Sequence, residues 1–226
     1  LRGTIQITGS WDREQPRRRL CLRGSTVPEI HYSPHGVRYE LFRSALDDST
    51  AIPGDVATLP KPIIGFYGNL HPWVDFGLII SLAKARPSWS FVLIGDRFVD
   101  VSVLEVCRNV FLPGRREHNE LPGYCRAFDT AIVPYDMRQA RMQSVSPVKT
   151  RELLAAGVPV VAADLPELRG MSPDVAVCRT DAEWLQALDS AVARTDRQAI
   201  SDRVAGHDWS ERVRWMRSIV EGEALA

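Results

Sequence analysis

Short apolar runs alternate with helix-like stretches from Ile63 toward the end of the chain. Six runs have the length of buried strands: Ile63–Tyr67, Phe91–Ile94, Val110–Leu112, Thr130–Val133, Val160–Ala163 and Val175–Val177. Helical patterns occupy most of the gaps, at Phe76–Ala85, Leu121–Ala127, Val148–Ala156 and Glu183–Val192. This alternation predicts an α/β fold: a doubly wound, Rossmann-like parallel sheet of about six strands with helices on both faces.

The segments outside this pattern divide the rest of the chain. We expect residues 1–38 to be a remnant or edge of a preceding N-terminal domain, because Leu1 is not a natural initiator. Residues 39–62 include a stretch rich in Asp, Pro, Gly, Ser and Thr and are predicted to be a linker. Residues 63–205 form the predicted Rossmann-like domain, and residues 206–226 a C-terminal helix that packs back. An apolar stripe on that helix predicts core or interdomain contact: Trp209, Val213, Met216, Ile219 and Val220.

The start of the helix predicted at 148–156 carries an unusual charge. Ser146 suits the N-cap, Pro147 the first helical position and Gly157 the left-handed residue that ends a helix. Lys149 stands where a capping box would place Glu or Gln, so a cation faces the positive end of the helix dipole. An anion bound at that end would account for a cation at this position. The plain alternative is that Lys149 is solvated or pairs with Glu152 one turn later.

Glycine and basic residues follow the predicted strands at the edge where open parallel sheets bind ligands. Glycine lets the backbone approach a ligand, and arginine binds negatively charged groups. This edge therefore favours a nucleotide-sized anionic ligand. His71 at the same edge is either a catalytic base or a polar loop residue. The glycine and basic residues are Gly65, Gly68, Gly95, Arg97, Gly114, Arg115, Arg116, Arg138 and Arg141.

Composition and missing motifs exclude several classes of function. The 226 residues carry 28 Lys+Arg and 28 Asp+Glu, and this zero net charge argues against bulk binding of nucleic acid. No apolar run approaches the roughly 20 residues of a membrane span. The absence of G-x-G-x-x-G and of a Walker A sequence disfavours a nicotinamide dehydrogenase and an NTPase. The four cysteines are far apart and form no CxxC, so we expect reduced thiols in a cytoplasmic protein and no zinc site: Cys21, Cys107, Cys125 and Cys178.

Five motifs between His35 and Trp209 resemble the C-terminal, donor-binding domain of GT-B glycosyltransferases, in the retaining group that uses nucleotide-sugars. The specific motif is K-x-x-E-x-x-A-x-G-x-P-V-V, present as Lys149-Thr-Arg-Glu152-Leu-Leu-Ala155-Ala-Gly157-Val-Pro159-Val-Val. The other four are Pro34-His-Gly36-Val37-Arg38, Gly65-Phe-Tyr-Gly68-Asn69, Asp129-Thr-Ala-Ile-Val-Pro134 and Trp209 near the last helix.

The resemblance implies a donor site around that specific motif. Glu152 would accept hydrogen bonds from the ribose hydroxyls, because a vicinal diol offers two donors to a carboxylate. Lys149 and the amides that follow Ser146 would hold the diphosphate, so Lys149 and Glu152 are the predicted catalytic residues. These transferases generally need no bound metal, since the helix end and cations stabilise the leaving diphosphate.

The resemblance also assigns residues that flank the donor. Gly68 and Asn69 would pass close to the phosphates or the sugar. Gly95 and the loop of Arg115 and Arg116 would flank the base.

Three positions depart from the family pattern. Ser144 stands where the family often has a second glutamate, and Asn69 and Asp75 stand near the places of an Arg and a Lys. Candidate substitutes for the missing cations are Arg138, Arg141 and Arg151.

A GT-B enzyme reacts in a cleft between two domains, and this sequence resembles only the second. We therefore expect donor binding by this chain, and transfer to a glycan, lipid or small-molecule acceptor only by a longer protein. No nucleic-acid partner is expected, and the full-length enzyme is a candidate for peripheral membrane association. Two other functions remain open: a non-hydrolysing sugar-nucleotide epimerase on the same architecture, and a non-catalytic, degenerate GT-B interaction module.

Overall fold

A computed structural model describes residues 35–221, with side chains described as far as Ser218. The described residues, 35–221, belong to one compact unit. The predicted N-terminal remnant at 1–38 therefore lies almost wholly outside the described residues, as do Cys21 and the side chains of Ile219 and Val220.

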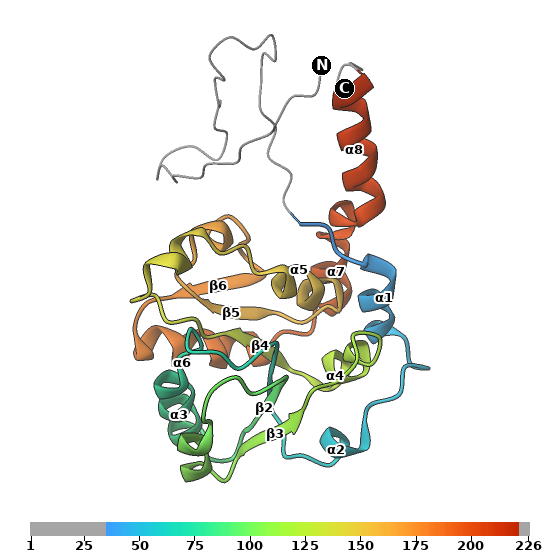
Figure 1. The fold of residues 1–226 in the computed structure, drawn as a ribbon. Helices are drawn as coiled ribbons and strands as arrows, with labels where there is room; N and C mark the ends of the chain where they lie inside the picture. The colour runs from blue at the N-terminus through green and yellow to red at the C-terminus, as the bar shows by residue number, and fades with distance from the viewer. Residues whose placement is uncertain (1–34, 222–226) are drawn as a thin grey trace. The chain divides into compact units, whose positions relative to one another are not determined.

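Six parallel strands form one sheet in the order β3-β2-β1-β4-β5-β6 (Figure 1). Their register places Gly65 of β1 between Val92 of β2 and Ala131 of β4. The chain crosses from the β3 edge back to β4, so strand order reverses between β1 and β4, where open sheets bind ligands. The strands are β1 Ile63–Tyr67, β2 Ser90–Ile94, β3 Val110–Gly114, β4 Thr130–Val133, β5 Val160–Ala163 and β6 Val175–Cys178.

Helices cover both faces of this sheet, as the sequence predicts. Helices α3 and α6 pack together on one face, and α4 and α5 lie on the other with α1 and α7 beside them (Figure 1). The predicted bounds of α3 and α4 match the structure, whereas α7 has no counterpart in the prediction. The bounds are α3 Phe76–Ala85, α4 Leu121–Ala127, α5 Val148–Ala155, α6 Asp181–Val192 and α7 Arg197–Asp202, with short 3-10 helices η2 Ser102–Val106, η3 Ala140–Ser144, η4 Pro166–Leu168 and η5 Ala205–His207.

The segment 39–62, which we expected to be a linker, contains packed structure. Helix α1 (Tyr39–Arg43), η1 (Ser44–Leu46) and α2 (Gly54–Ala57) lie within it. Phe42, Ala45 and Val56 are buried in the same core as the sheet. Full burial of a side chain such as Phe42 contributes on the order of 1.5–3 kcal/mol, so this segment helps to stabilise the domain.

The C-terminal helix α8 (Trp209–Glu221) begins where the chain returns to the start of the domain. Val37 donates its N–H to the carbonyl of His207 and accepts a bond from the N–H of Trp209. Asp208 caps the helix, because its carboxylate accepts from the Ser210 N–H at 2.8 Å. Within the described side chains, Trp209, Val213 and Met216 of the predicted apolar stripe are exposed, although the ring of Trp209 also lies against Gly36.

Two negative findings concern residues 35–221. No helix there is long and apolar enough to cross a membrane. No group of three or more His, Cys, Asp or Glu residues in the described part is placed to hold a metal ion. Cys107, Cys125 and Cys178 are free and buried.

Candidate functional site

Helix α5 begins without a side-chain cap, beside the point where strand order reverses. The structure corrects two local predictions: Pro147 occupies the N-cap rather than the first helical position, and Ser146 does not cap the helix. The Ser146 hydroxyl instead donates to Glu167 at 2.8 Å. The first N–H groups of a helix have no partner within it, so this uncapped end has donors available to an anion.

The other end of α5 is closed by glycine, as predicted. Gly157 has φ +70° and donates to the carbonyl of Leu154 at 2.8 Å, while Val158 donates to Leu153 at 2.9 Å. These paired bonds make a Schellman motif, which satisfies the last carbonyls and directs the chain into β5. The motif fixes the position of α5 and therefore of the side chains on its first turns.

Lys149 lies on the first turn of α5 and directs its amine toward the carboxyl end of β1. The nitrogen lies 4.4 Å from the ring centroid of Phe66 and 5.5 Å from that of Tyr135. It makes no hydrogen bond or ion pair with any residue of the described part. Burial lowers the pKa of this amine to about 8, although the charge of nearby Glu152 acts in the opposite direction. The amine is thus a desolvated cation with unused donors at the ligand-binding edge of the sheet.

Gly68 and Gly95 shape the backbone next to this amine. A Cβ on Gly68 would lie 2.1 Å from the Lys149 nitrogen, so a side chain at residue 68 would displace the amine. The φ of +134° also favours glycine at this position. A Cβ on Gly95 would lie 2.1 Å from the carbonyl oxygen of Gly68. Both predicted glycines therefore lie together with Lys149, while Asn69 is exposed just beyond Gly68.

Glu152 lies one turn after Lys149 and already has a partner on each oxygen. The Tyr67 hydroxyl donates to Oε2 at 3.0 Å, and Nε2 of His118 lies 2.8 Å from Oε1. Burial, followed by the charge of Glu152, holds the pKa of Tyr67 well above its usual value, so the phenol stays protonated and donates. Sequence reasoning did not identify Tyr67 or His118, because only the fold brings residues 67, 118 and 152 together.

The basic loop after β3 is occupied by contacts within the protein. Arg116 donates to the Tyr124 hydroxyl at 2.5 Å and to Asp55 at 2.8 Å. Arg115 is exposed and lies 3.5 Å from a Glu117 oxygen. Neither arginine forms a hydrogen bond or ion pair with Lys149 or Glu152, and of the two only Arg115 has its side chain largely in solvent.

The three arginines considered as substitutes for missing cations have other partners. Arg138 pairs with Asp136 at 2.7 Å, and Arg141 lies over the Trp73 ring at 4.4 Å. Arg151 is 5% exposed and pairs with Glu167 at 2.6 Å, in the contact that also engages Ser146.

Asp75 and His71 are explained by local structure. Asp75 caps α3 by accepting from the Leu78 N–H at 2.9 Å. His71 stacks between Trp73 and Phe98, with centroid distances of 3.9 Å and 4.2 Å. The stacked ring fits the polar-loop interpretation of His71 and joins the loop after β1 to the loop after β2.

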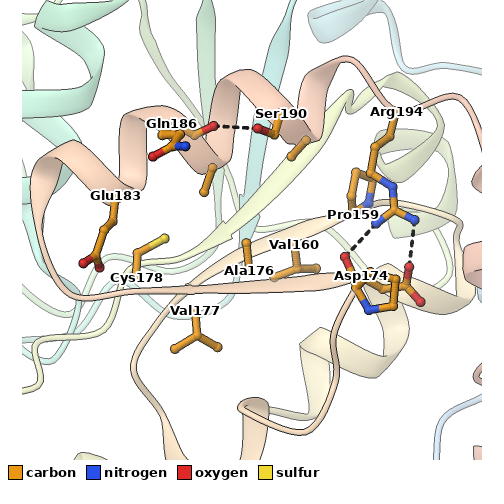
Figure 2. A pocket seen from close by; sticks show the side chains of 13 residues that line it. Pro159, Val160, Asp174, Ala176, Val177, Cys178, Glu183, Gln186, Ser190 and Arg194 are labelled. Atoms are coloured by element: carbon orange, nitrogen blue, oxygen red, sulfur yellow. Dashed lines mark hydrogen bonds and ion pairs between the residues drawn. The ribbon is translucent and has the colours of Figure 1, made fainter.

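Hollows elsewhere on the domain do not coincide with the Lys149 site. A hollow of about 320 Å³ lies between β6 and α6, lined by residues such as Ala176, Cys178 and Arg194, none of them a predicted site residue (Figure 2). A second, of about 510 Å³, lies at the ends of β4, β5 and β6. Tyr135 lines this second hollow and also borders the Lys149 amine, so the two regions are adjacent.

Comparison with known proteins agrees with this architecture. Residues 61–195 match the family model described as Glycosyl transferases group 1. The chain is 34% identical over 149 residues to TuaH of Bacillus subtilis (strain 168), whose name assigns it to teichuronic acid biosynthesis as a glycosyltransferase. That match covers 63% of this chain and 36% of TuaH.

Solved structures share the fold at low sequence identity. Sucrose-phosphate synthase from Thermosynechococcus elongatus superposes with a TM-score of 0.64 at 17% identity, covering 88% of this chain and 53% of that one. Anabaena Alr3699/HepE in complex with UDP gives a TM-score of 0.62 at 17% identity, with coverage of 83% and 56%. The chain thus spans about a third of its curated relative and about half of these solved chains. Because the family model matches more than half of its residues, the chain belongs to the glycosyl transferases group 1 family.

Proposed function

We propose that this chain is the donor-binding part of a longer, retaining GT-B glycosyltransferase. It would bind a nucleotide-diphospho-sugar, whose sugar the whole enzyme transfers to an acceptor. The observation that carries the proposal is the Lys149 amine, a partly buried cation with unused donors at the uncapped start of α5. The related HepE structures contain UDP and UDP-glucose, which makes UDP the first nucleotide to test.

The proposed chemistry follows from where charge grows in the reaction. As the bond between the sugar and the diphosphate breaks, negative charge accumulates on the leaving diphosphate. The Lys149 amine and the first N–H groups of α5 would stabilise that charge more in the transition state than in the bound donor. Glu152 would accept hydrogen bonds from the ribose hydroxyls and fix the nucleotide. The proposal includes no metal ion, because the amine and the helix end supply the positive charge.

A cytoplasmic location is part of this proposal. Nucleotide-sugars are the proposed substrates, and the free buried thiols of Cys107, Cys125 and Cys178 suit a reducing compartment.

Calorimetric titration and thermal unfolding of this chain with UDP test the proposal. UDP at a hundred times its Kd should stabilise the fold by about 2.7 kcal/mol. Lys149→Met should weaken UDP binding by about tenfold or more, because one charge-assisted contact to phosphate is lost. Lys84→Met is the matched control, since Lys84 is exposed in the last turn of α3 and should leave binding unchanged. The proposal fails if neither UDP nor any other common nucleoside diphosphate stabilises the protein.

A further inference from the structure

The carboxylate of Glu152 is held from two sides before any ligand is considered. Its side chain is only 12% exposed, and each oxygen has one neighbour at hydrogen-bond distance. A carboxylate offers about four acceptor positions on its two oxygens. Two neighbours therefore leave about one acceptor position on each oxygen, which matches the two donors of a vicinal diol.

The partner on Oε2 is a fixed part of the core. Tyr67 is the last residue of β1 and is 5% exposed. Its ring stacks near that of Phe42, with centroids 6.3 Å apart. Because this phenol is buried and protonated, it supplies a permanent donor to Glu152.

The partner on Oε1 comes from the surface loop after β3. The His118 side chain is 45% exposed, yet its ring contacts buried Phe42, with centroids 5.1 Å apart and planes at 70°. An ionised carboxylate only accepts hydrogen bonds, so Nε2 of His118 must donate to Glu152. His118 is thus held by an aromatic contact as well as by its hydrogen bond.

We propose that His118 is a positioning residue of the donor site, which holds one oxygen of Glu152 so that the carboxylate meets the ribose diol in a single orientation. The inference rests on the proposed function and adds a residue to it, on a loop outside the α5 motif. His118 acts through Glu152 and makes no contact with the sugar that is transferred. Its effect must therefore depend on the ribose hydroxyls of the ligand.

The test compares UDP with 2′,3′-dideoxy-UDP, which lacks both hydroxyls, in titrations against the whole chain. The wild type should prefer UDP by about tenfold or more, the value of one or two hydrogen bonds to a charged group. His118→Phe keeps a ring against Phe42 but loses the donor, and should reduce that preference to about twofold. His118→Gln replaces the donor without the ring, and should restore most of the preference.

Glu117→Gln is the control, because Glu117 is exposed in the same loop. Loss of the Glu117 charge should change the affinities for UDP and 2′,3′-dideoxy-UDP by the same factor and leave the preference for UDP unchanged. The inference is wrong if His118→Phe keeps the wild-type preference, binds UDP more tightly than the wild type, or weakens both nucleotides equally. If the wild type binds no common nucleoside diphosphate, the proposed function fails together with the inference. If it binds another nucleoside diphosphate in place of UDP, the comparison uses that nucleotide and its 2′,3′-dideoxy analogue. If it binds both equally, UDP binding stands and the inference alone fails.

Discussion

At the scale of single residues, Lys149 combines an unfavourable position with an available charge. A lysine on the first turn of a helix opposes the helix dipole, and burial adds a desolvation cost that lowers its pKa to about 8. No carboxylate of the described residues pairs with it within hydrogen-bond distance. An anion that binds here offsets both costs, because its negative charge favours the protonated form of the Lys149 amine.

This linkage predicts a pH dependence of nucleotide binding. In the protein without ligand, the Lys149 amine is mostly protonated near pH 7 and loses its proton above about pH 8. A diphosphate favours the charged amine, so binding takes up a proton in that range. Affinity for UDP should fall by up to tenfold per unit as pH rises above about 8. Calorimetric titrations between about pH 7 and pH 9.5 would measure this fall.

Lys149→Met provides the control for that measurement. Its weaker binding should be nearly flat over the same range, because the titrating amine is gone. An equally steep fall in the variant would mean that another group titrates on binding and that Lys149 does not meet the phosphates.

The glycines of the motif at the end of β1 show two different uses at this scale. A Cβ on Gly65 would lie 2.1 Å from the ring of Phe128, so the absence of a side chain at Gly65 allows Phe128 to pack against β1. Gly68, three residues later, leaves space for the Lys149 amine. The motif residue Asp129 is also structural, since it accepts from the N–H of Ile63 at 2.6 Å and fixes the start of β1.

At the scale of elements, α5 is fixed by contacts at its C-terminal end and has no side-chain cap at its start. Its Schellman motif places the helix against β5, and Arg197 of α7 donates to the carbonyl of Ala156 at 3.2 Å and to that of Cys125 at 2.8 Å. One partly buried guanidinium thus satisfies carbonyls at the ends of α4 and α5. The uncapped start of α5 is left as the end with unused donors.

Gly157→Ala should destabilise the domain. Residue 157 has φ +70°, and a Cβ there would lie 2.6 Å from the carbonyl oxygen of Arg197 and 2.8 Å from a methyl group of Leu46. Backbone strain together with a clash against backbone should lower the free energy of unfolding by about 2 kcal/mol or more. Urea unfolding followed by circular dichroism measures the change.

Gly206→Ala is the matched control. A Cβ at residue 206 meets no atom within 4 Å, and its φ is not in the positive range. Its free energy of unfolding should stay within about 0.5 kcal/mol of that of the wild type. Equal effects of the two substitutions would show that the left-handed turn at Gly157 does not fix α5.

Elements with a strong local pattern were predicted from the sequence, and those fixed by distant contacts were not. The apolar runs of β1, β4 and β5 and the helical pattern of α3 give the observed bounds, because each pattern lies within its own segment. Helix α7 is short, and it is fixed by bonds from Arg197 to carbonyls about 70 residues away in sequence.

The candidate site divides in the same way. Lys149, Glu152, Gly68 and Gly95 were predicted because one motif and two strand ends bring them to one edge of the sheet. Ser146 looked like a cap, but Glu167 engages its hydroxyl through a tertiary contact. The pairing of His118 with Glu152 has no local signal, since 34 residues separate them.

At the scale of the whole molecule, the chain covers only part of the length of its relatives. It spans 36% of TuaH and 53% of the sucrose-phosphate synthase chain. The proposed donor binding involves only the edge of the sheet near Lys149. Transfer also requires an acceptor held next to the anomeric carbon, on the face that the leaving diphosphate occupies when the configuration is retained, with water kept out.

We therefore expect this 226-residue chain to bind a nucleotide-sugar without forming a glycosidic bond. A protein extended upstream by a second α/β domain should transfer the sugar and retain its anomeric configuration. NMR analysis of the products distinguishes the outcomes: a new glycosidic bond indicates a transferase, and an isomerised donor an epimerase. Lys149→Met in the extended protein serves as the inactive control, since it lacks the cation that stabilises the leaving diphosphate. Transfer by the 226-residue chain alone would contradict the prediction, because it would place the acceptor site within the residues that hold the donor.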